Sequence, residues 1–292
     1  MTFHKKTGYR VKNKFRPDIY IQYIYFFPIV IIHLLLWGCA SPPSPVSVIQ
    51  KAEIPVSEFI AGYSVQNRPI LCIRAGNGEE IILLVASIHG DEIAGTPLAY
   101  SLLNYFRNNP HLLEGRTVFF LPLANPDGVA AYSRFNRRNV DLNRNFPSAN
   151  RQDKKRSGDF PSSEPETRTI MQLIRTYRPA RIISIHEPMN CIDYDGPGES
   201  LAAFISDYCY LPVKKIGAMP GSLGSYAGAE LGIPVITLEL PEEAAVMDTE
   251  ILWQLYGKAL LASVLYPQKP EHSFVRTEMN EKKARGKIPE AK

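Results

Sequence analysis

The sequence predicts one α/β domain in which helices cover both faces of a mixed, mostly parallel sheet. Short apolar stretches rich in β-branched residues recur at 81–88, 117–123, 181–185 and 234–240, each close to turn residues. Such nearly continuous apolar runs are typical of strands buried on both faces. Helical patterns separate most of these runs, so the fold class that we expect is a three-layer α/β/α sandwich.

The elements follow in order from about residue 56. We expect paired strands at 69–75 and 81–89, joined by a turn at 76–78. A helix at 92–107 and a strand at 117–123 come next, and then a long loop at 129–159, a length that is usually functional. The remaining predicted elements are a helix at 163–177, a strand at 181–185, a helix at 200–210, a turn at 221–225, a strand at 234–240 and a closing helix at 242–265.

The two ends of the chain have compositions unlike that of a folded domain. Residues 1–38 combine a basic start with an apolar run at 20–37, which is the pattern of a signal peptide. Residues 39–55 are rich in Pro and Ser and predict a linker, and 267–292 predict a polar flexible tail. The folded domain is therefore expected at 56–266.

The sequence Leu36-Trp37-Gly38-Cys39 resembles the lipobox of bacterial lipoproteins, in which the cysteine is acylated and becomes the mature amino terminus. The alternative is that residues 20–37 remain as a transmembrane anchor, since the run is about long enough to span a membrane. Both readings place the domain in the bacterial cell envelope, on the extracytoplasmic, periplasmic side, with the membrane as a partner. In the first reading Cys39 carries the lipid.

The charge of the chain argues against nucleic acid as a partner, and its cysteines leave two structural alternatives. Residues 1–38 hold six basic side chains and one acidic one, so their removal changes the net charge from +4 to −1. No basic patch then remains to indicate nucleic acid as a partner. Cys72, Cys191 and Cys209 are left over; Cys191 and Cys209 can form a disulfide, or all three can be small buried side chains.

Three residues predict a metal site. His89 and Glu92 follow the strand at 81–88, and His186 ends the strand at 181–185. Because the ends of neighbouring parallel strands meet at one edge of a sheet, these side chains can reach a common point. Two imidazoles and one carboxylate are a catalytic ligand set for Zn²⁺. The other histidines of the mature chain, His111 and His272, lie in a helix-to-strand connection and in the tail.

A hydrolytic zinc site also needs a carboxylate that does not bind the metal and that can move a proton. Glu239 is the best candidate, because it interrupts the apolar strand at 234–240, where an unpaired acid is costly to bury. A salt-bridged acid at the end of a strand is the structural alternative.

At this point several motifs resemble the zinc carboxypeptidase family. They are HGDE at 89–92, NPDG at 125–128, DLNRNFP at 141–147, the strand-end His186 and the glutamate of TLEL at 237–240. Within that family, the segments SEPET (163–167), SIHEP (184–188) and PGSLGSY (220–226) are similar to bacterial amidases that trim peptides of murein.

The resemblance implies the carboxypeptidase fold and a set of roles. His89, Glu92 and His186 would bind one Zn²⁺, with Glu239 as general base and acid. Arg134 would polarise the scissile carbonyl, with Arg137 and Arg138 as rivals for that role. Asn143 and Arg144 would bind the terminal carboxylate of the substrate, and Asp141 would orient a zinc-bound histidine. Two departures stand out: the family's catalytic tyrosine has no clear counterpart, although Tyr226 lies nearby, and Asn139 replaces a common glycine.

We therefore expect a zinc-dependent hydrolase that cleaves an amide bond next to a terminal carboxylate. By resemblance, this bond is the γ-D-glutamyl-meso-diaminopimelate link of a murein peptide. One alternative is an ordinary metallocarboxypeptidase acting on α-linked peptides. Others are a non-catalytic wall-binding lipoprotein and a deacylase of N-acyl amino acids.

Overall fold

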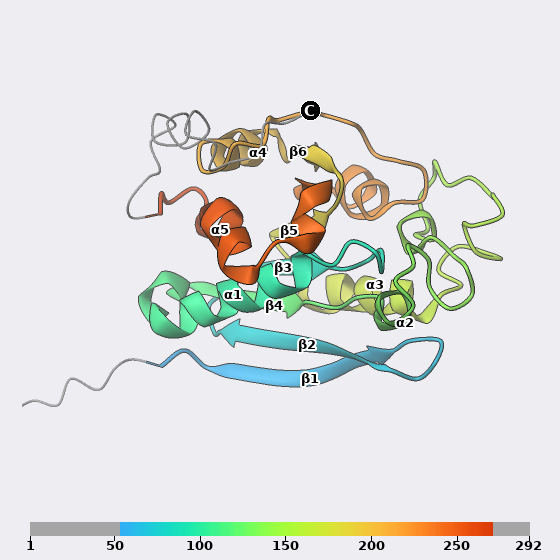
Figure 1. Ribbon diagram of the computed structural model, residues 1–292, viewed down its shortest axis with the longest axis horizontal. Helices are drawn as coiled ribbons and strands as arrows, with labels where there is room; N and C mark the ends of the chain where they lie inside the picture. Colours follow the sequence, from blue (N-terminus) through green and yellow to red (C-terminus); the bar gives the residue numbers. More distant parts are fainter. Residues whose placement is uncertain (1–52, 271–292) are drawn as a thin grey trace, which may run out of the picture. The chain divides into compact units, whose positions relative to one another are not determined.

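The computed structural model describes residues 53–270. Within them, seven strands form one sheet in the order β1-β2-β4-β3-β5-β7-β6 (Figure 1). The central strands β4, β3, β5 and β7 are parallel to one another, and the outer strands β1, β2 and β6 pair antiparallel. The strands are β1 (Val56–Tyr63), β2 (Pro69–Gly76), β3 (Glu80–Ala86), β4 (Arg116–Leu121), β5 (Arg181–His186), β6 (Met189–Asp195) and β7 (Val235–Pro241).

Helices cover both faces of this sheet. On one face, α1 (Gly95–Asn108), α4 (Glu199–Ser206) and α5 (Thr249–Leu265) share a hydrophobic cluster with the sheet, and α1 lies beside α5 (Figure 1). On the other face, α3 (Pro165–Tyr177) and the π-helix η3 (Gly224–Glu230) pack in a second cluster. The predicted α/β/α sandwich with a mixed sheet is therefore confirmed.

Strand patterning explains the two faces. Every residue of β4 and β5 is buried, as expected of strands covered on both sides. Along β5, Ile183 and Ile185 face the cluster under α1 and α5, whereas Ile182 belongs to the cluster under α3. Ser184 and His186 alternate with these residues, so they share the face of Ile182. Ser184 and His186 thus lie on the face covered by α3 and η3, whereas Arg181 at the start of the strand lies on the face of α5.

Several element boundaries differ from the prediction. The strands at 69–75 and 81–89 are not paired with each other, because β4 lies between β2 and β3. The predicted helix at 242–265 is two elements, the 3₁₀ turn η4 (Glu242–Val246) and α5, separated by extended backbone at Met247 and Asp248. The strands β1 and β6 were not predicted.

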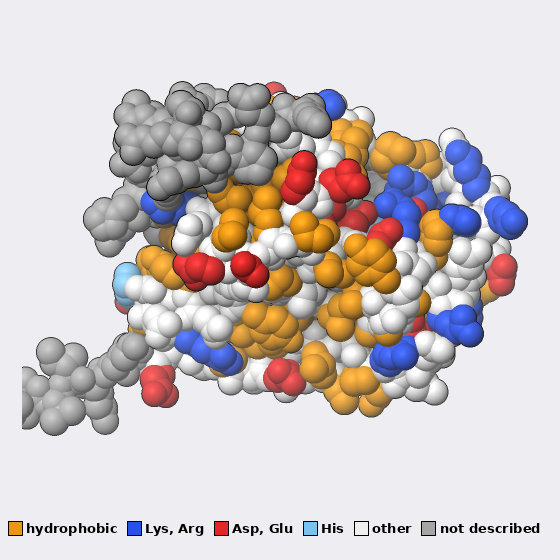
Figure 2. Space-filling model, viewed as in Figure 1, with side chains coloured by type: hydrophobic (Ala, Val, Ile, Leu, Met, Phe, Trp, Pro, Cys, Tyr) orange, Lys and Arg blue, Asp and Glu red, His pale blue; other side chains and the backbone are white. Residues whose placement is uncertain are grey.

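The long connection between α2 (Pro126–Ala130) and α3 contains one short 3₁₀ turn, η2 (Leu142–Arg144). Asn136 fixes its first part, because its Nδ2 donates to Glu164 and Glu166 and its Oδ1 accepts from Val140 N. Lys and Arg side chains gather over this part of the molecule (Figure 2). The exposed basic residues of the connection are Arg137, Arg138, Lys154, Lys155 and Arg156.

The remaining turn, η1 (Pro110–Leu113), joins α1 to β4 and contains His111, as predicted. Cys72, Cys191 and Cys209 are buried and free, so the alternative of three small buried side chains holds. No helix between residues 53 and 270 has the length and apolar character that crossing a membrane requires. The predicted signal peptide, the predicted lipidation site Cys39 and most of the predicted linker and tail lie outside the described residues.

Candidate active site

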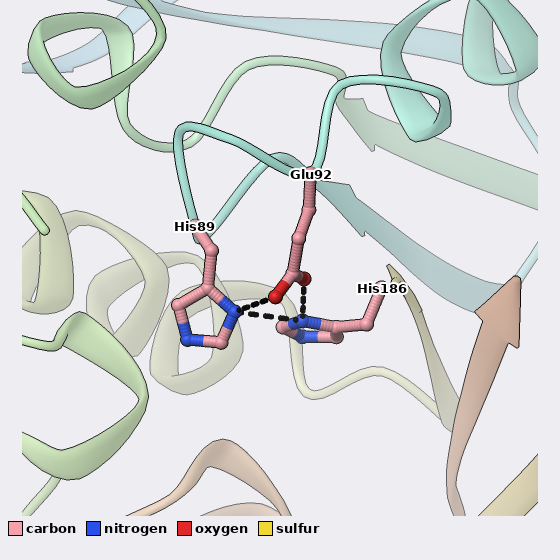
Figure 3. Close-up of side chains that lie close together, drawn as sticks. All are labelled: His89, Glu92 and His186. Atoms are coloured by element: carbon pink, nitrogen blue, oxygen red, sulfur yellow. Dashed lines mark hydrogen bonds and ion pairs between the residues drawn. The ribbon is translucent and has the colours of Figure 1, made fainter. Parts of the chain in front are cut away.

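His89, Glu92 and His186 converge above the carboxyl ends of β3 and β5 (Figure 3). The Nδ1 of His89 lies 2.7 Å from Glu92 Oε1, and the Nδ1 of His186 lies 2.6 Å from Glu92 Oε2. The two Nδ1 atoms are 3.2 Å apart. All three side chains are buried, and one ligand atom of each lies within 4.8 Å of the others.

The start of α1 explains how Glu92 reaches the histidines. We predicted a helix from residue 92, but α1 begins at Gly95, and residues 87–94 form a connecting segment. Asn125 supports this segment by donating from Nδ2 to Ile88 O. A Cβ on Gly90 would overlap with the backbone of Gly128, so a glycine at position 90 allows the HGDE and NPDG turns to touch.

Asp141 selects the tautomer of His89. Its Oδ1 lies 3.1 Å from His89 Nε2, and an ionised carboxylate can only accept a hydrogen bond from that nitrogen. Nε2 is therefore assigned as the donor, which leaves the Nδ1 lone pair directed toward Glu92 and His186. This is how an outer acid orients a metal-bound histidine.

The electrostatics of the group favour positive charge between the ligand atoms. Burial alone would lower the pKa of His89, but Glu92 and Asp141 together raise it to about 9. Burial would raise the pKa of Glu92, but His186 and His89 hold it well below its usual range. A buried anion facing two imidazole nitrogens is a donor set that fits a divalent zinc ion.

Glu239 lies on β7 directly beside His186, since the two residues are register partners. Its Oε2 is buried without a hydrogen-bond partner among the described residues. Burial raises the pKa of Glu239, His186 lowers it and Glu92 raises it further. This carboxylate therefore has an unused oxygen beside the three converging side chains.

A cavity of about 190 Å³ opens next to this group, and His89, Glu92, His186 and Glu239 line it. Arg134 lines it as well and donates from Nη1 to Glu92 Oε1 (2.9 Å) and from Nε to Asp141 Oδ2 (3.2 Å). The rival arginines lie elsewhere: Arg137 lines a separate hollow, and Arg138 pairs with Glu164.

Asn143 and Arg144 reach the same cavity from η2. Asn143 Oδ1 accepts from Leu223 N, so its amide NH₂ is the end that can donate to a ligand. Arg144 is fixed by a hydrogen bond from Nη1 to Asn143 O (2.6 Å). Two donors side by side suit a carboxylate.

Two further observations concern the departures noted in the sequence. Tyr226 is buried, stacks on Phe146 and accepts from Arg175 Nε, and it does not line the cavity. Asn139 has φ of +63°, the left-handed conformation for which an asparagine can replace glycine.

Besides Glu187, the sequence reasoning missed four polar strand residues that line the cavity: Ser184, Asp193, Asp195 and Thr237. The four strand residues alternate with apolar residues along β5, β6 and β7, so a period of two was the available signal. For Asp193 and Asp195 this signal was overlooked because residues 189–195 were not recognised as a strand.

Comparisons with known proteins agree with this geometry. A family model described as zinc carboxypeptidase matches residues 49–199. Murein peptide amidase A of Escherichia coli (strain K12) is 33% identical over 199 residues, covering 62% of this chain and 79% of the relative. Murein peptide amidase A of Vibrio campbellii is 30% identical over 226 residues, covering 69% and 86%.

Solved structures share the fold. The murein-tripeptide amidase from Escherichia coli O157 has a TM-score of 0.59 at 28% identity, and the match covers 76% of this chain and 96% of that one. Carboxypeptidase A from Helicoverpa armigera has a TM-score of 0.61 at 20% identity, covering 73% and 69%, and is similar in fold.

Proposed function

Because this chain belongs to the zinc carboxypeptidase family, we propose that it is a zinc hydrolase that cleaves an amide bond next to a terminal carboxylate in murein peptides. More specifically, we propose that the bond cleaved is the γ-D-glutamyl-meso-diaminopimelate bond. One observation carries the proposal: three buried ligand side chains, an acid with an unpaired oxygen and two carboxylate-binding side chains all line one cavity.

His89, Glu92 and His186 hold the zinc, and Asp141 orients His89 through Nε2. When bound, zinc supplies Lewis acidity and makes water easier to deprotonate. Glu239 takes the proton from the attacking water and passes it to the leaving amine. The raised pKa of Glu239 suits both steps, because it brings the pKa closer to neutral pH, where a carboxyl group can both accept and release a proton.

Arg134 donates to the oxygen on which negative charge develops, and it has a fixed charge suited to that task. Its contacts with Glu92 and Asp141 hold it beside the ligand set. Arg144 and the amide of Asn143 bind the terminal carboxylate of the substrate. Binding the chain end in this way aligns the last amide bond with Glu239.

The murein substrate is supported by the names of the relatives at 30–33% identity. The exposed basic side chains of the connection between α2 and α3 also suit a substrate with several carboxylates. These relatives favour murein peptides over the α-linked and non-catalytic alternatives.

The test is to incubate the zinc-loaded domain with two peptides that share one terminal residue, one γ-linked through D-glutamate and one α-linked. Metal content is measured in the same preparation, and mass spectrometry identifies the products. We expect one zinc per chain, release of the terminal residue from the γ-linked peptide, and loss of activity after chelation.

Faster cleavage of the α-linked peptide would favour an ordinary carboxypeptidase. Zinc binding with no cleavage of wall peptides or either synthetic peptide would reject the hydrolase.

We also propose that residues 1–38 are a signal peptide, that Cys39 carries a lipid, and that the domain at 56–266 lies on the extracytoplasmic side of the membrane. The lipobox-like sequence before Cys39 supports this placement. Metabolic labelling with a fatty acid should mark the wild type and leave Cys39→Ala unlabelled. Labelling of both proteins would contradict lipidation at Cys39.

A further inference from the structure

A second hollow lies beside the segment that carries Arg134, outside the zinc cavity. Its volume is about 360 Å³, and none of the residues that line it also lines the zinc cavity. Ser133 and Phe135 line the hollow, whereas Arg134 between them lines the zinc cavity. The other walls are α2 and the turn between β1 and β2, which contributes Gln66 and Arg68. The proposed chemistry gives this hollow no role.

The base of the hollow is preformed, because its two buried polar side chains are hydrogen-bonded within the protein. Asp127 accepts from Ser64 Oγ and from Gln66 N, each at 2.9 Å, and from Arg68 Nη1 at 2.5 Å. Asn136 is held by the contacts with α3 and with its own loop that were described above. The charge of Asp127 is therefore balanced by Arg68, and a ligand meets a surface that is already ordered.

Arg137 is the cation of the hollow that has no partner in the protein. It is exposed, and its guanidinium makes no hydrogen bond or ion pair within residues 53–270. Two arginines against one aspartate give the lining a net charge of +1. Arg156 adds positive charge nearby, since its Cζ lies 3.8 Å from the centre of the Phe135 ring. The hollow therefore favours a negatively charged ligand.

Neutral polar groups surround this charge. Gln66 Oε1 accepts from Arg68 Nη1, so the NH₂ group of Gln66 is the end that can bind a ligand. Ser133 Oγ accepts a backbone hydrogen bond, which leaves its hydroxyl proton available. The side-chain amide of Asn139 has no partner in the described part of the chain and offers both a donor and an acceptor.

We propose that this hollow binds a carboxylate with a neighbouring amide, as in an N-acylated amino acid or the last residue of a peptide. The carboxylate pairs with Arg137, because the parallel N–H groups of a guanidinium match its two oxygens. The amide carbonyl of the ligand accepts from Gln66 or Ser133, and the amide N–H donates to Asn139 Oδ1.

Charge and size favour this class of ligand. One carboxylate balances the lining, whereas a phosphate monoester carries about two negative charges and exceeds it. Small-molecule sites begin at about 300 Å³, so the hollow suits a compact ligand. Ala130 and Ala131 present small apolar groups and leave room for a short side chain. The inference does not depend on the proposed hydrolase, because the two cavities share no lining residue.

The test adds N-acetylalanine to the zinc-loaded protein and follows backbone amide resonances by NMR. Ala130 and Ala131 report on the hollow, and Leu223 reports on the zinc cavity. All titrations use Glu239→Gln, so that no probe is cleaved. N-acetylalaninamide is the matched neutral probe. We expect saturable shifts at both alanines with N-acetylalanine, and binding of the neutral probe that is weaker by at least about tenfold.

The matched variants are Arg137→Met and Arg138→Met. The two arginines are neighbours and both are exposed, but Arg138 pairs with Glu164 and does not line the hollow. Arg137→Met should raise the dissociation constant of N-acetylalanine by at least about tenfold, and Arg138→Met by less than about twofold. Equal weakening in the two variants would show that general positive charge attracts the probe and would overturn the inference.

Three other results would also overturn it: shifts at Leu223 without shifts at the two alanines, equal binding of the charged and neutral probes, or tighter binding of inorganic phosphate at the alanines. Acetyl-trialanine distinguishes the two sources of the carboxylate. Tighter binding than N-acetylalanine would support a peptide end, and weaker binding would support a free N-acylated amino acid. A wild type that hydrolyses no wall peptide would reject the proposed function and leave these binding results unchanged.

Discussion

The two ends of the parallel strands both carry buried charges, but they satisfy them differently. At the amino ends, Arg181 donates to Glu80 and to Ser263 O and Val264 O at the end of α5. Arg116 pairs with the same Glu80 and donates to Leu265 O. These arginines complete the hydrogen bonding of a helix end, so their charges are structural.

At the carboxyl ends, the charges converge without such closure. Glu92 is paired with His89, His186 and Arg134, but Glu239 keeps a buried oxygen unpaired, and Asp195 has no hydrogen bond or ion pair among the described residues. Burying an oxygen such as that of Glu239 without a partner costs free energy that nothing in the protein itself returns. The comparison indicates that buried charges with hydrogen-bond partners in the protein stabilise the fold, whereas buried charges with an unpaired oxygen mark where a ligand binds.

The sharpest way to break this comparison is at Glu239. Glu239→Gln keeps the shape of the side chain but removes the base, so we expect kcat to fall by about 10³-fold with the zinc content unchanged. Steady-state kinetics and metal analysis on the same preparation measure both quantities. Full turnover in this variant would mean that another group moves the proton.

The next largest effect is expected at Arg144. Arg144→Met removes the charge that holds the terminal carboxylate, so kcat/KM should fall by about 10²-fold, chiefly through KM. The matched control is Arg138→Met, since Arg138 lies on the same connection but is 56% exposed and does not line the cavity. Equal losses in the two variants would show that general positive charge matters and not a specific contact.

At the opposite edge, Arg181→Met should change stability and not catalysis. Glu80 and the carbonyl groups at the end of α5 lose their donor, which we expect to lower the free energy of unfolding by about 3 kcal/mol. Denaturant unfolding measures this loss. The kcat per folded molecule should stay at the wild-type value, and a selective loss of kcat would contradict the structural role.

The smallest effect concerns pH and Asp195. Its pKa is about 6 in the folded protein against an ordinary value of 3.8, so the folded state holds this proton to higher pH. Its contribution to stability therefore falls as pH rises from about 4 to 6. We expect Asp195→Asn to gain about 1 kcal/mol over the wild type at pH 7 and little at pH 4, because cavity water screens part of the charge. Unfolding of both proteins at the two pH values checks the sign.

Residues at and near the predicted zinc ligands illustrate what could be predicted from the sequence. The apolar runs at 81–88 and 181–185 and the polar residues that end them were sufficient to place His89 and His186 at one edge of the sheet. The replacement of a glycine by Asn139 was likewise explained by the tolerance of asparagine for left-handed backbone, and the structure confirms a positive φ at this residue. The pairing of β2 with β4 was missed. The turn at 76–78 favours a hairpin of β2 with β3, and only the complete sheet shows that β4 lies between these two strands.

The amino-acid sequence by itself determined which strands are buried and which donor types stand at their ends, since both follow from local patterns of one or two residues. Only the tertiary structure decided that Arg134 and not Arg137 or Arg138 lines the cavity, that Asp141 meets Nε2 of His89, and that Asp195 has no hydrogen bond or ion pair within residues 53–270. Those facts depend on the register of β5, β7 and β6 and on how a long connection folds over them. Contacts between segments far apart along the chain set that register, and no local pattern contains it.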